Sequence, residues 1–423
     1  MYKRVLSVSL VMLLAIALFT TFGVAQRRVS FMTLWAGPEL EALEATLRPF
    51  ELRTGIDVQV ESVGRDLPTI LFTRFRAGNP PDVAALPNPG QMKEFVEEDG
   101  LVSLDFLDLS DHPKAFVDLG SVTGRVYGIF ISADLKSLVW YNSGVLGKTN
   151  ISTWDDLVQF TEGLSVAGKT AWCIGLESGA ASGWPGTDWI EDIMLRTAGP
   201  EVYDAWVAHD IPWTDFRVKR AFELFGQIAR NNDFVFGGTR GALSINFGDS
   251  PAAMFTSPPG CFLHRQASFI QSFILGANPS LMAVDDYNVF VFPAIDPAQG
   301  NPLLGSGDLI SAFNDTPEAR ELLQYLASAE AQEIWVGRLG KLATNINVDA
   351  SVYPDPITAQ AANILRSAEV FRFDGSDLMP AAVGSGAFWS GVLDYVSGTP
   401  LDAVLENIEE AADAAYTSGT ATD

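Results

Sequence analysis

Cysteine and histidine are scarce in this chain of 423 residues, which has two cysteines and three histidines. His112, His209 and His264 stand in unrelated sequence contexts, and none has a zinc-type spacing to another ligand residue. No catalytic Ser/His motif surrounds them. The sequence therefore predicts no metal site and no cofactor.

Basic residues are also few, because 27 Lys and Arg stand against 52 Asp and Glu, for a formal net charge of −25. So acidic a balance argues against nucleic acid or anionic lipid as a partner. The hydrophobic share of 48% and the 10 tryptophans exclude a disordered acidic tail, since enough apolar surface exists to offset chain entropy.

The N-terminus is typical of an exported protein. Lys3 and Arg4 precede an uncharged run at 5–22, and Gly-Val-Ala follows at 23–25. This pattern predicts a signal peptide over 1–25, cleaved after Ala25, and a periplasmic or secreted protein. A retained membrane anchor is the alternative. No cysteine lies at the cleavage point to suggest a lipoprotein, and the remaining chain is long enough for two domains.

Export also bears on the two cysteines, Cys173 and Cys261, because an exported chain meets oxidising conditions. A disulfide between them closes a loop of nearly ninety residues and stabilises the fold by about 4 kcal/mol. Two buried free thiols are the alternative.

Strand and helix patterns alternate along the chain, with no internal repeat. This alternation predicts an α/β protein with parallel sheets covered by helices. The expected strands lie at 29–35, 57–61, 82–86, 138–141, 288–293 and 309–313. The expected helices lie at 38–54, 67–77, 216–231 and 317–338, and a further helix begins after the cap residue Thr153.

Short motifs follow one another in a characteristic order: Trp-Ala-Gly-Pro-Glu at 35–39, Pro-Pro-Asp-Val at 80–83, Trp-Tyr-Asn at 140–142, Thr-Trp-Asp-Asp-Leu at 153–157, Gly-Ser-Gly-Asp at 305–308 and Leu-Gly-Lys-Leu-Ala-Thr-Asn at 339–345. In this order they resemble the extracellular solute-binding proteins (family 1) of carbohydrate ABC transporters. Segments 184–193 and 203–213 look like the α-glucoside-binding branch.

The resemblance implies a two-lobe periplasmic binding protein fold of type II, in which each lobe has a mixed, mainly parallel sheet flanked by helices. We expect residues 26–140 and 305–367 in lobe I, and 141–304 and 368–423 in lobe II. The hinge crossings are expected near 140–142, 293–305 and 368–374. A sugar would bind between the lobes, and the partner would be the membrane permease of an ABC importer. The protein is expected to be a monomer.

A neutral sugar needs hydrogen-bond partners for its hydroxyls and flat apolar surfaces for its C–H faces. Residues of these kinds near strand ends are the candidate ligand contacts: Trp35, Gly37, Glu39, Asp82, Lys136, Trp184, Asp188, Trp189, Gly305, Gly307, Asp308, Arg372 and Asp374.

Each candidate also has a structural interpretation. Trp35, Trp184 and Trp189 could belong to the cores. Glu39 could complement a helix dipole, and Asp82 could cap a turn. Solvent or Asp134 could pair with Lys136. The glycines at 305 and 307 could simply form a turn, and Arg372 could form a salt bridge with an aspartate of its own loop, 371–377.

Two other functions remain possible from the sequence. A secreted glycoside hydrolase needs a pair of carboxylates, which 52 acidic residues could supply. The sequence has no eightfold strand–helix repeat and no catalytic motif to support it. An adhesion module would fit the acidic surface but not two α/β halves.

Overall fold

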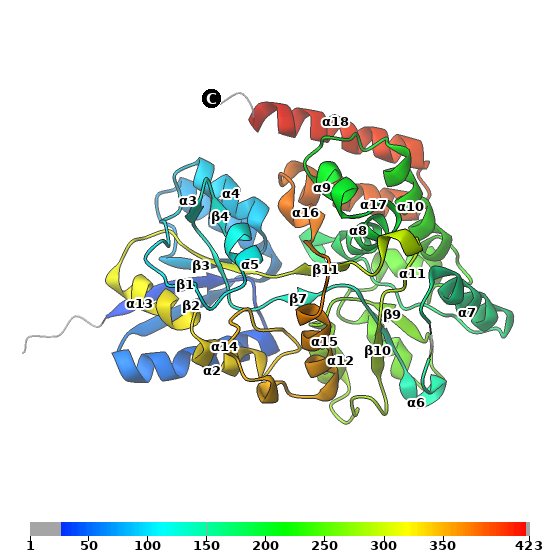
Figure 1. Ribbon diagram of the computed structural model, residues 1–423, viewed down its shortest axis with the longest axis horizontal. Coiled ribbons are helices and arrows are strands. Elements are labelled where there is room, and N and C mark those ends of the chain that lie inside the picture. The colour runs from blue at the N-terminus through cyan, green and yellow to red at the C-terminus, as the bar shows by residue number, and fades with distance from the viewer. Residues whose placement is uncertain (1–26, 150, 420–423) are drawn as a thin grey trace, which may run out of the picture.

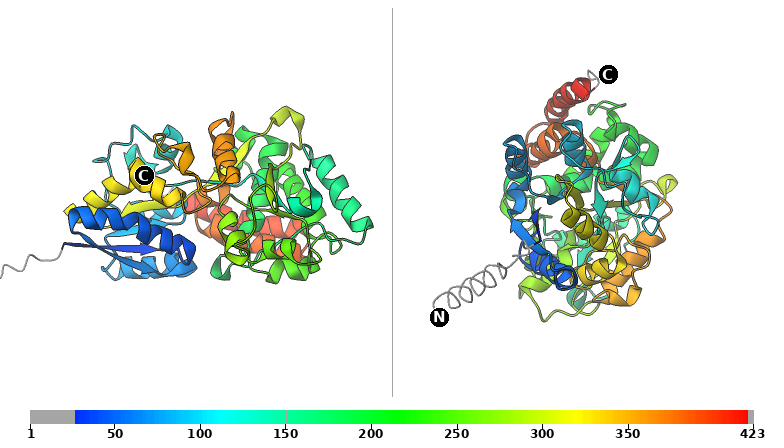
Figure 2. Two further views of the ribbon diagram at one scale, coloured as in Figure 1. Left: turned by 90° about the horizontal axis from the view of Figure 1, so that it is seen from below. Right: turned by 90° about the vertical axis from the view of Figure 1, so that its left-hand side faces the viewer.

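Two lobes of helices packed on small sheets lie side by side, with a few strands running between them (Figure 1; two further views in Figure 2). The computed structural model describes residues 27–149 and 151–419. The predicted signal peptide and its cleavage point therefore lie outside the described residues. Within this part of the chain, every helix is too short or too polar to cross a membrane.

A five-stranded sheet forms the centre of the first lobe, in the order β2-β1-β3-β12-β6. β1 pairs in parallel with both β2 and β3, whereas β12 is antiparallel to β3 and β6. The strand bounds are β1 Arg28–Thr33, β2 Asp57–Ser62, β3 Val83–Leu86, β6 Ile129–Phe130 and β12 Leu309–Ala312, with a separate hairpin of β4 Ser121–Val122 and β5 Arg125–Val126.

Helices cover both faces of this sheet, with α2 and α14 on one side and α3 and α4 on the other (Figure 1). Apolar side chains between these layers, such as Phe31, Leu43 and Trp335, form a core of their own. The helices are α2 Pro38–Thr54, α3 Leu67–Arg76, α4 Pro89–Glu97, α5 Lys114–Leu119, α13 Pro317–Leu326 and α14 Ala329–Val336.

The second lobe is mostly helical and has a three-stranded sheet in the order β10-β8-β9. Its strands are β8 Leu138–Tyr141, β9 Leu263–Arg265 and β10 Asn288–Val291. Both pairings are antiparallel, so the expectation of a mainly parallel sheet is wrong for this lobe. The helices are α6 Ser143–Leu146, α7 Trp154–Val166, α8 Trp184–Ala198, α9 Pro200–Val207, α10 Phe216–Ala229, α11 Gly238–Ser244, α12 Ile270–Ala277, α16 Gly375–Leu378, α17 Trp389–Ser397 and α18 Leu401–Gly419.

Three short strands pair with one another between the lobes: β7 Asp134–Leu135, β11 Leu303–Ser306 and β13 Phe371–Phe373 (Figure 1). β13 lies within the segment 368–374 where a crossing was expected, and β11 overlaps the end of the segment 293–305. The first connection is β7 rather than residues 140–142, which lie in or directly after β8 of the second lobe. α15 Pro356–Arg366 falls in the range expected for lobe I, yet its Ile357 packs with Ile270 and Ile274 of α12.

Local signals in the sequence explain most of these elements. Thr153 forms the capping box with Asp156 that the sequence predicts, and Thr316 accepts a hydrogen bond from the Ala319 N–H at the start of α13. The single helix predicted at 317–338 is wrong, because Ser328 caps a second helix, α14, and divides the segment. The predicted disulfide is confirmed: Cys173 and Cys261 are bonded, with Cα atoms 5.5 Å apart.

Candidate functional site: the cleft between the lobes

A cavity of about 310 Å³ lies where the two lobes meet. The first lobe contributes Leu34, Glu39, Pro68, Thr69, Pro87, Asn88, Gln91 and Asp308 to its lining, and the second lobe contributes Ala180, Ala181, Trp184, Phe269, Phe273, Asp377 and Trp389. Such a volume is at the lower end of the range for small-molecule sites.

The lobes also touch around this cavity. The Ala381 N–H, which follows α16, donates to Glu94 Oε1 of α4 over 3.2 Å. Gly90 lies so close to Met379 that an added Cβ would be 2.7 Å from its carbonyl oxygen. The short helices η1 Gly64–Asp66 and η2 Gly179–Ala181 also contact each other. The structure is therefore one in which the lobes are closed on the cavity.

Lys341 lies at the centre of a charged cluster on the first-lobe wall. Its Nζ is 3.3 Å from Glu39 Oε1, 3.3 Å from Asp134 Oδ2 and 3.5 Å from Asp308 Oδ2. Burial lowers the pKa of Lys341, but the three carboxylates outweigh it and hold that pKa above its ordinary value. Trp35 Nε1 donates to Asp308 Oδ2 over 2.7 Å and so fixes that carboxylate.

Lys136 lies at the centre of a second cluster, on the opposite wall. Its Nζ is 2.8 Å from Asp188 Oδ1 and forms a second ion pair with Asp374. Burial lowers the pKa of Lys136, but the charges of Asp188 and Asp374 outweigh this effect. The net pKa lies well above its ordinary value, so the ammonium stays charged. Its own side chain is only 7% exposed.

The Lys136 cluster continues into the second-lobe core through α8. Arg265 Nη1 lies 3.3 Å from Asp188 Oδ2, and its Nη2 lies 2.9 Å from Asp192 Oδ2. Asp192 also pairs with Arg196 one turn later on the helix. Asp188, Asp192 and Arg196 stand at i, i+4 and i+8, so one face of α8 carries this whole row of charges.

Glu191, also on α8, holds α16 at the edge of the cavity. Its Oε2 and Oε1 accept hydrogen bonds of 3.0 Å from the Gly375 and Ser376 N–H groups. This places Asp377 in the lining of the cavity. Burial, and then the charge of Asp374, raises the pKa of Asp377 well above its ordinary value.

Aromatic side chains supply the apolar part of the second-lobe wall. Trp184 packs edge-on against Phe247 with ring centroids 5.1 Å apart, and Lys136 Nζ lies 5.5 Å from its ring centroid. The indole Nε1 atoms of Trp184 and Trp389 are buried and have no hydrogen-bond partner among the described residues. Both side chains line the cavity, so each can offer an apolar ring surface to a ligand.

Six of the residues predicted to bind ligand line this cavity: Glu39, Lys136, Trp184, Gly307, Asp308 and Asp374. Gly307 must be glycine, because an added Cβ would lie 2.7 Å from the Ser132 carbonyl oxygen. This close approach lets β7 and β11 continue into the floor of the cavity.

The other predicted residues lie outside the lining. Trp35 and Trp189 are packed in the cores of their own lobes. Asp188 lies one layer behind, on Lys136, and Gly305 packs on Phe371 of the connecting sheet.

Three more have local structural roles. Gly37 is an exposed turn with φ +54° before α2. Asp82 accepts from the Ser30 backbone and hydroxyl groups. Arg372 forms a salt bridge, but with Asp204 of α9 and not with an aspartate of its own loop.

Comparison with known proteins agrees with this arrangement. The sequence profile of the family described as "Bacterial extracellular solute-binding protein" matches residues 45–363. The chain belongs to this family. This solute-binding protein is 43% identical over 392 residues to the "Osmoprotective compounds-binding protein GgtB" of Synechocystis. The aligned region covers 91% of this chain and 92% of the relative.

A second curated relative and two solved structures also match most of this chain. The "Alpha-glucosides-binding periplasmic protein AglE" of Rhizobium meliloti is 38% identical over 396 residues, 90% of this chain and 85% of its own. Among solved structures, a "Chitin oligosaccharide binding protein" superposes with a TM-score of 0.78 at 18% identity, covering 92% of this chain and 99% of that one. "Maltose bound T. maritima MalE3" has a TM-score of 0.73 at 18% identity, with 91% and 99% covered. These structures confirm the two-lobe fold.

Sequence reasoning missed several lining residues of this solute-binding protein, above all Lys341, Trp389 and Phe269. Lys341 lies within the motif at 339–345 that carried the family resemblance, so a signal for it existed. Trp389 follows Phe388 at the start of α17, and its neighbours gave no sign that this indole would face the other lobe.

Proposed function

We propose that this solute-binding protein captures a neutral sugar, an α-glucoside or a short oligosaccharide, in the cleft between its lobes and delivers it to the permease of an ABC importer. We further propose that it is exported by a signal peptide cleaved after Ala25, acts in the periplasm or as a secreted monomer, and catalyses no reaction itself.

The observation that carries the proposal is that indole rings and carboxylates line one cavity. The side chains of Trp184 and Trp389 stand there together with Asp308, Asp374 and Asp377. A sugar hydroxyl can donate to a carboxylate, while the C–H face of the sugar packs on an indole ring.

The charges of the lining favour a neutral ligand. Five carboxylates stand there with only two lysines, and both lysines are already paired with at least two carboxylates each. An anionic sugar, such as a phosphate ester, would meet repulsion and no available cation.

Both lobes supply the lining, so a ligand makes all its contacts only when the lobes are closed. Its differential affinity for the closed form then shifts the balance between open and closed states. Two relatives carry names that describe them as binding osmoprotective compounds and α-glucosides, which supports the same class of ligand here.

The proposal can be tested by thermal unfolding with trehalose, sucrose, maltose and, as the anionic control, glucose 1-phosphate. A bound sugar at a hundredfold excess over its Kd stabilises the protein by about 2.7 kcal/mol. We expect at least one neutral sugar to raise Tm without any product detectable by chromatography. A release of glucose would favour a hydrolase, and a Tm unaffected by every sugar would contradict the proposal.

A further inference from the structure

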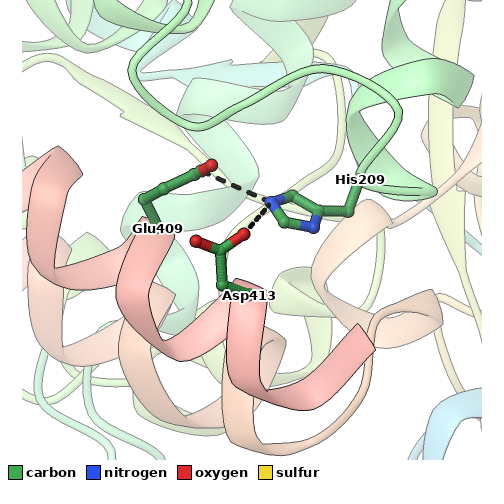
Figure 3. A group of neighbouring side chains, drawn as sticks. All are labelled: His209, Glu409 and Asp413. Atoms are coloured by element: carbon green, nitrogen blue, oxygen red, sulfur yellow. Dashed lines mark ion pairs between the residues drawn. The ribbon is translucent and has the colours of Figure 1, made fainter. Parts of the chain in front are cut away.

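A histidine faces two carboxylates on the outside of the second lobe, away from the cleft lining. His209 lies just after α9, and Glu409 and Asp413 stand one turn apart on α18 (Figure 3). His209 Nε2 is 3.4 Å from Glu409 Oε2 and 4.0 Å from Asp413 Oδ1. The three candidate ligand atoms all lie within 4.8 Å of one another.

These separations are close to those of a metal centre. A tetrahedral zinc ion with ligand bonds of about 2.0–2.2 Å keeps its ligand atoms roughly 3.3–3.6 Å apart. The histidine–glutamate distance already falls in that range, and a rotation of the Asp413 side chain, which is 71% exposed, can bring its oxygen closer. A neutral imidazole with two carboxylates compensates both charges of a divalent ion.

The histidine is held in position for this role. Its ring stacks on Tyr416 with centroids 5.0 Å apart and planes inclined by 30°. Its Nε2 atom is buried and has no hydrogen-bond partner among the described residues, although it points at both carboxylates. Its backbone is held at φ +60°, a conformation that a non-glycine residue adopts at some cost in free energy.

One carboxylate is also oriented from behind. Glu409 Oε2 accepts a hydrogen bond of 2.6 Å from the Trp213 N–H, which keeps this side chain turned toward the histidine. Groups that orient a ligand in this way are typical of metal sites. Asp413 is 71% exposed, so this side of the cluster is in contact with solvent.

We propose that His209, Glu409 and Asp413 bind one divalent transition-metal ion, with zinc as the best candidate, and that the ion fastens α18 to the segment after α9. Imidazole excludes magnesium and calcium as the preferred ions, since these take oxygen ligands. The histidine is two hundred residues from the carboxylates, which explains why spacing in the sequence predicted no metal site.

The test uses the full chain, purified without a histidine tag and dialysed against a chelator. Titration with ZnCl₂ in a calorimeter is expected to give one site per chain, and Tm is expected to rise with zinc concentration. Cobalt(II) is expected to give visible absorption bands of a four-coordinate site. His209→Ala and the pair Glu409→Gln with Asp413→Asn should each weaken zinc binding at least tenfold.

His112→Ala is the matched control, because His112 is also half-buried but stands apart from these carboxylates, and it should leave zinc binding unchanged. Circular dichroism confirms that each variant is folded. The absence of a zinc site, or a zinc site that survives His209→Ala, would overturn the proposal. A Tm that depends on pH through these residues but does not respond to zinc would also overturn it. The cluster would then be an ion pair that binds a proton.

Discussion

The two walls of the cleft use the same chemistry, a lysine among carboxylates, but hold it differently. On the first lobe, Lys341 shares three carboxylates at 3.3–3.5 Å, and Asp308 is 18% exposed. On the second lobe, Lys136 and Asp188 are buried and are backed by Arg265. The first wall can therefore rearrange its hydrogen bonds around a ligand, whereas the charged groups of the second wall are held rigidly in place.

The largest expected effect on stability comes from disrupting the buried charged cluster around Lys136. Asp188→Ala leaves two buried cations, Lys136 and Arg265, with one carboxylate each, Asp374 and Asp192, so we expect a loss of about 3–5 kcal/mol in unfolding free energy. Asp308→Ala, the matched change on the first wall, should cost about 1–2 kcal/mol, because Lys341 keeps Glu39 and Asp134. Urea unfolding followed by tryptophan fluorescence measures both, and equal losses would contradict the comparison.

The disulfide sharpens the same contrast, since it lies in the second lobe only. Replacing Cys173 and Cys261 with serine releases a cross-link across 88 residues and should cost about 2–5 kcal/mol. Differential scanning calorimetry should show this loss mainly in a transition that belongs to the second lobe. A uniform shift of all transitions would mean that the lobes unfold together.

Ligand affinity should depend most on the aromatic part of the second wall. Trp184→Ala should weaken sugar binding by about 30-fold or more, as for other buried aromatic contacts, because it removes the indole ring that lines the cavity. Trp189→Phe is the control, since Trp189 is packed in the core behind the cavity. Isothermal titration calorimetry measures both, and similar losses in the two variants would count against Trp184 as a ligand contact.

The smallest expected effect concerns pH and again the second lobe. Burial lowers the pKa of His264 from its ordinary value to about 4, so the folded protein keeps it neutral. The unfolded chain takes up this proton first as pH falls below about 6.5, so stability contributed by His264 is lost between about pH 6.5 and pH 4.

At pH 5.5 the unfolding free energy is expected to be about 1.4 kcal/mol lower than at neutral pH because of His264. His264→Gln should flatten the pH dependence of unfolding free energy in this window. An unchanged slope would show that other groups determine it.

The sequence allowed the first lobe to be predicted better than the second. Helix α2 begins and ends at the expected residues, because Pro38 begins it and Gly55 ends it in the left-handed conformation. The antiparallel sheet of the second lobe was not foreseen, since its strands come from segments more than a hundred residues apart and pair through tertiary contacts.

The sequence predicted only part of the cavity lining, because tertiary packing decides the rest. Residues at strand ends, such as Asp308 and Lys136, could be located from the strands themselves. Trp35 and Trp189 were expected at the ligand because tryptophan suits a sugar, but the same large apolar side chain also suits a core. Only the packing of the lobes decides which indoles line the cavity and which lie in a core.

The three paired strands between the lobes have a consequence for how the protein meets its partner. β7, β11 and β13 are hydrogen-bonded to one another, so the tethers cannot bend independently. Twisting or sliding of one lobe past the other would break those bonds, whereas folding about a line across all three preserves them. We therefore expect the lobes to open mainly by bending about that line, so that the surface facing a membrane partner changes along one hinge motion.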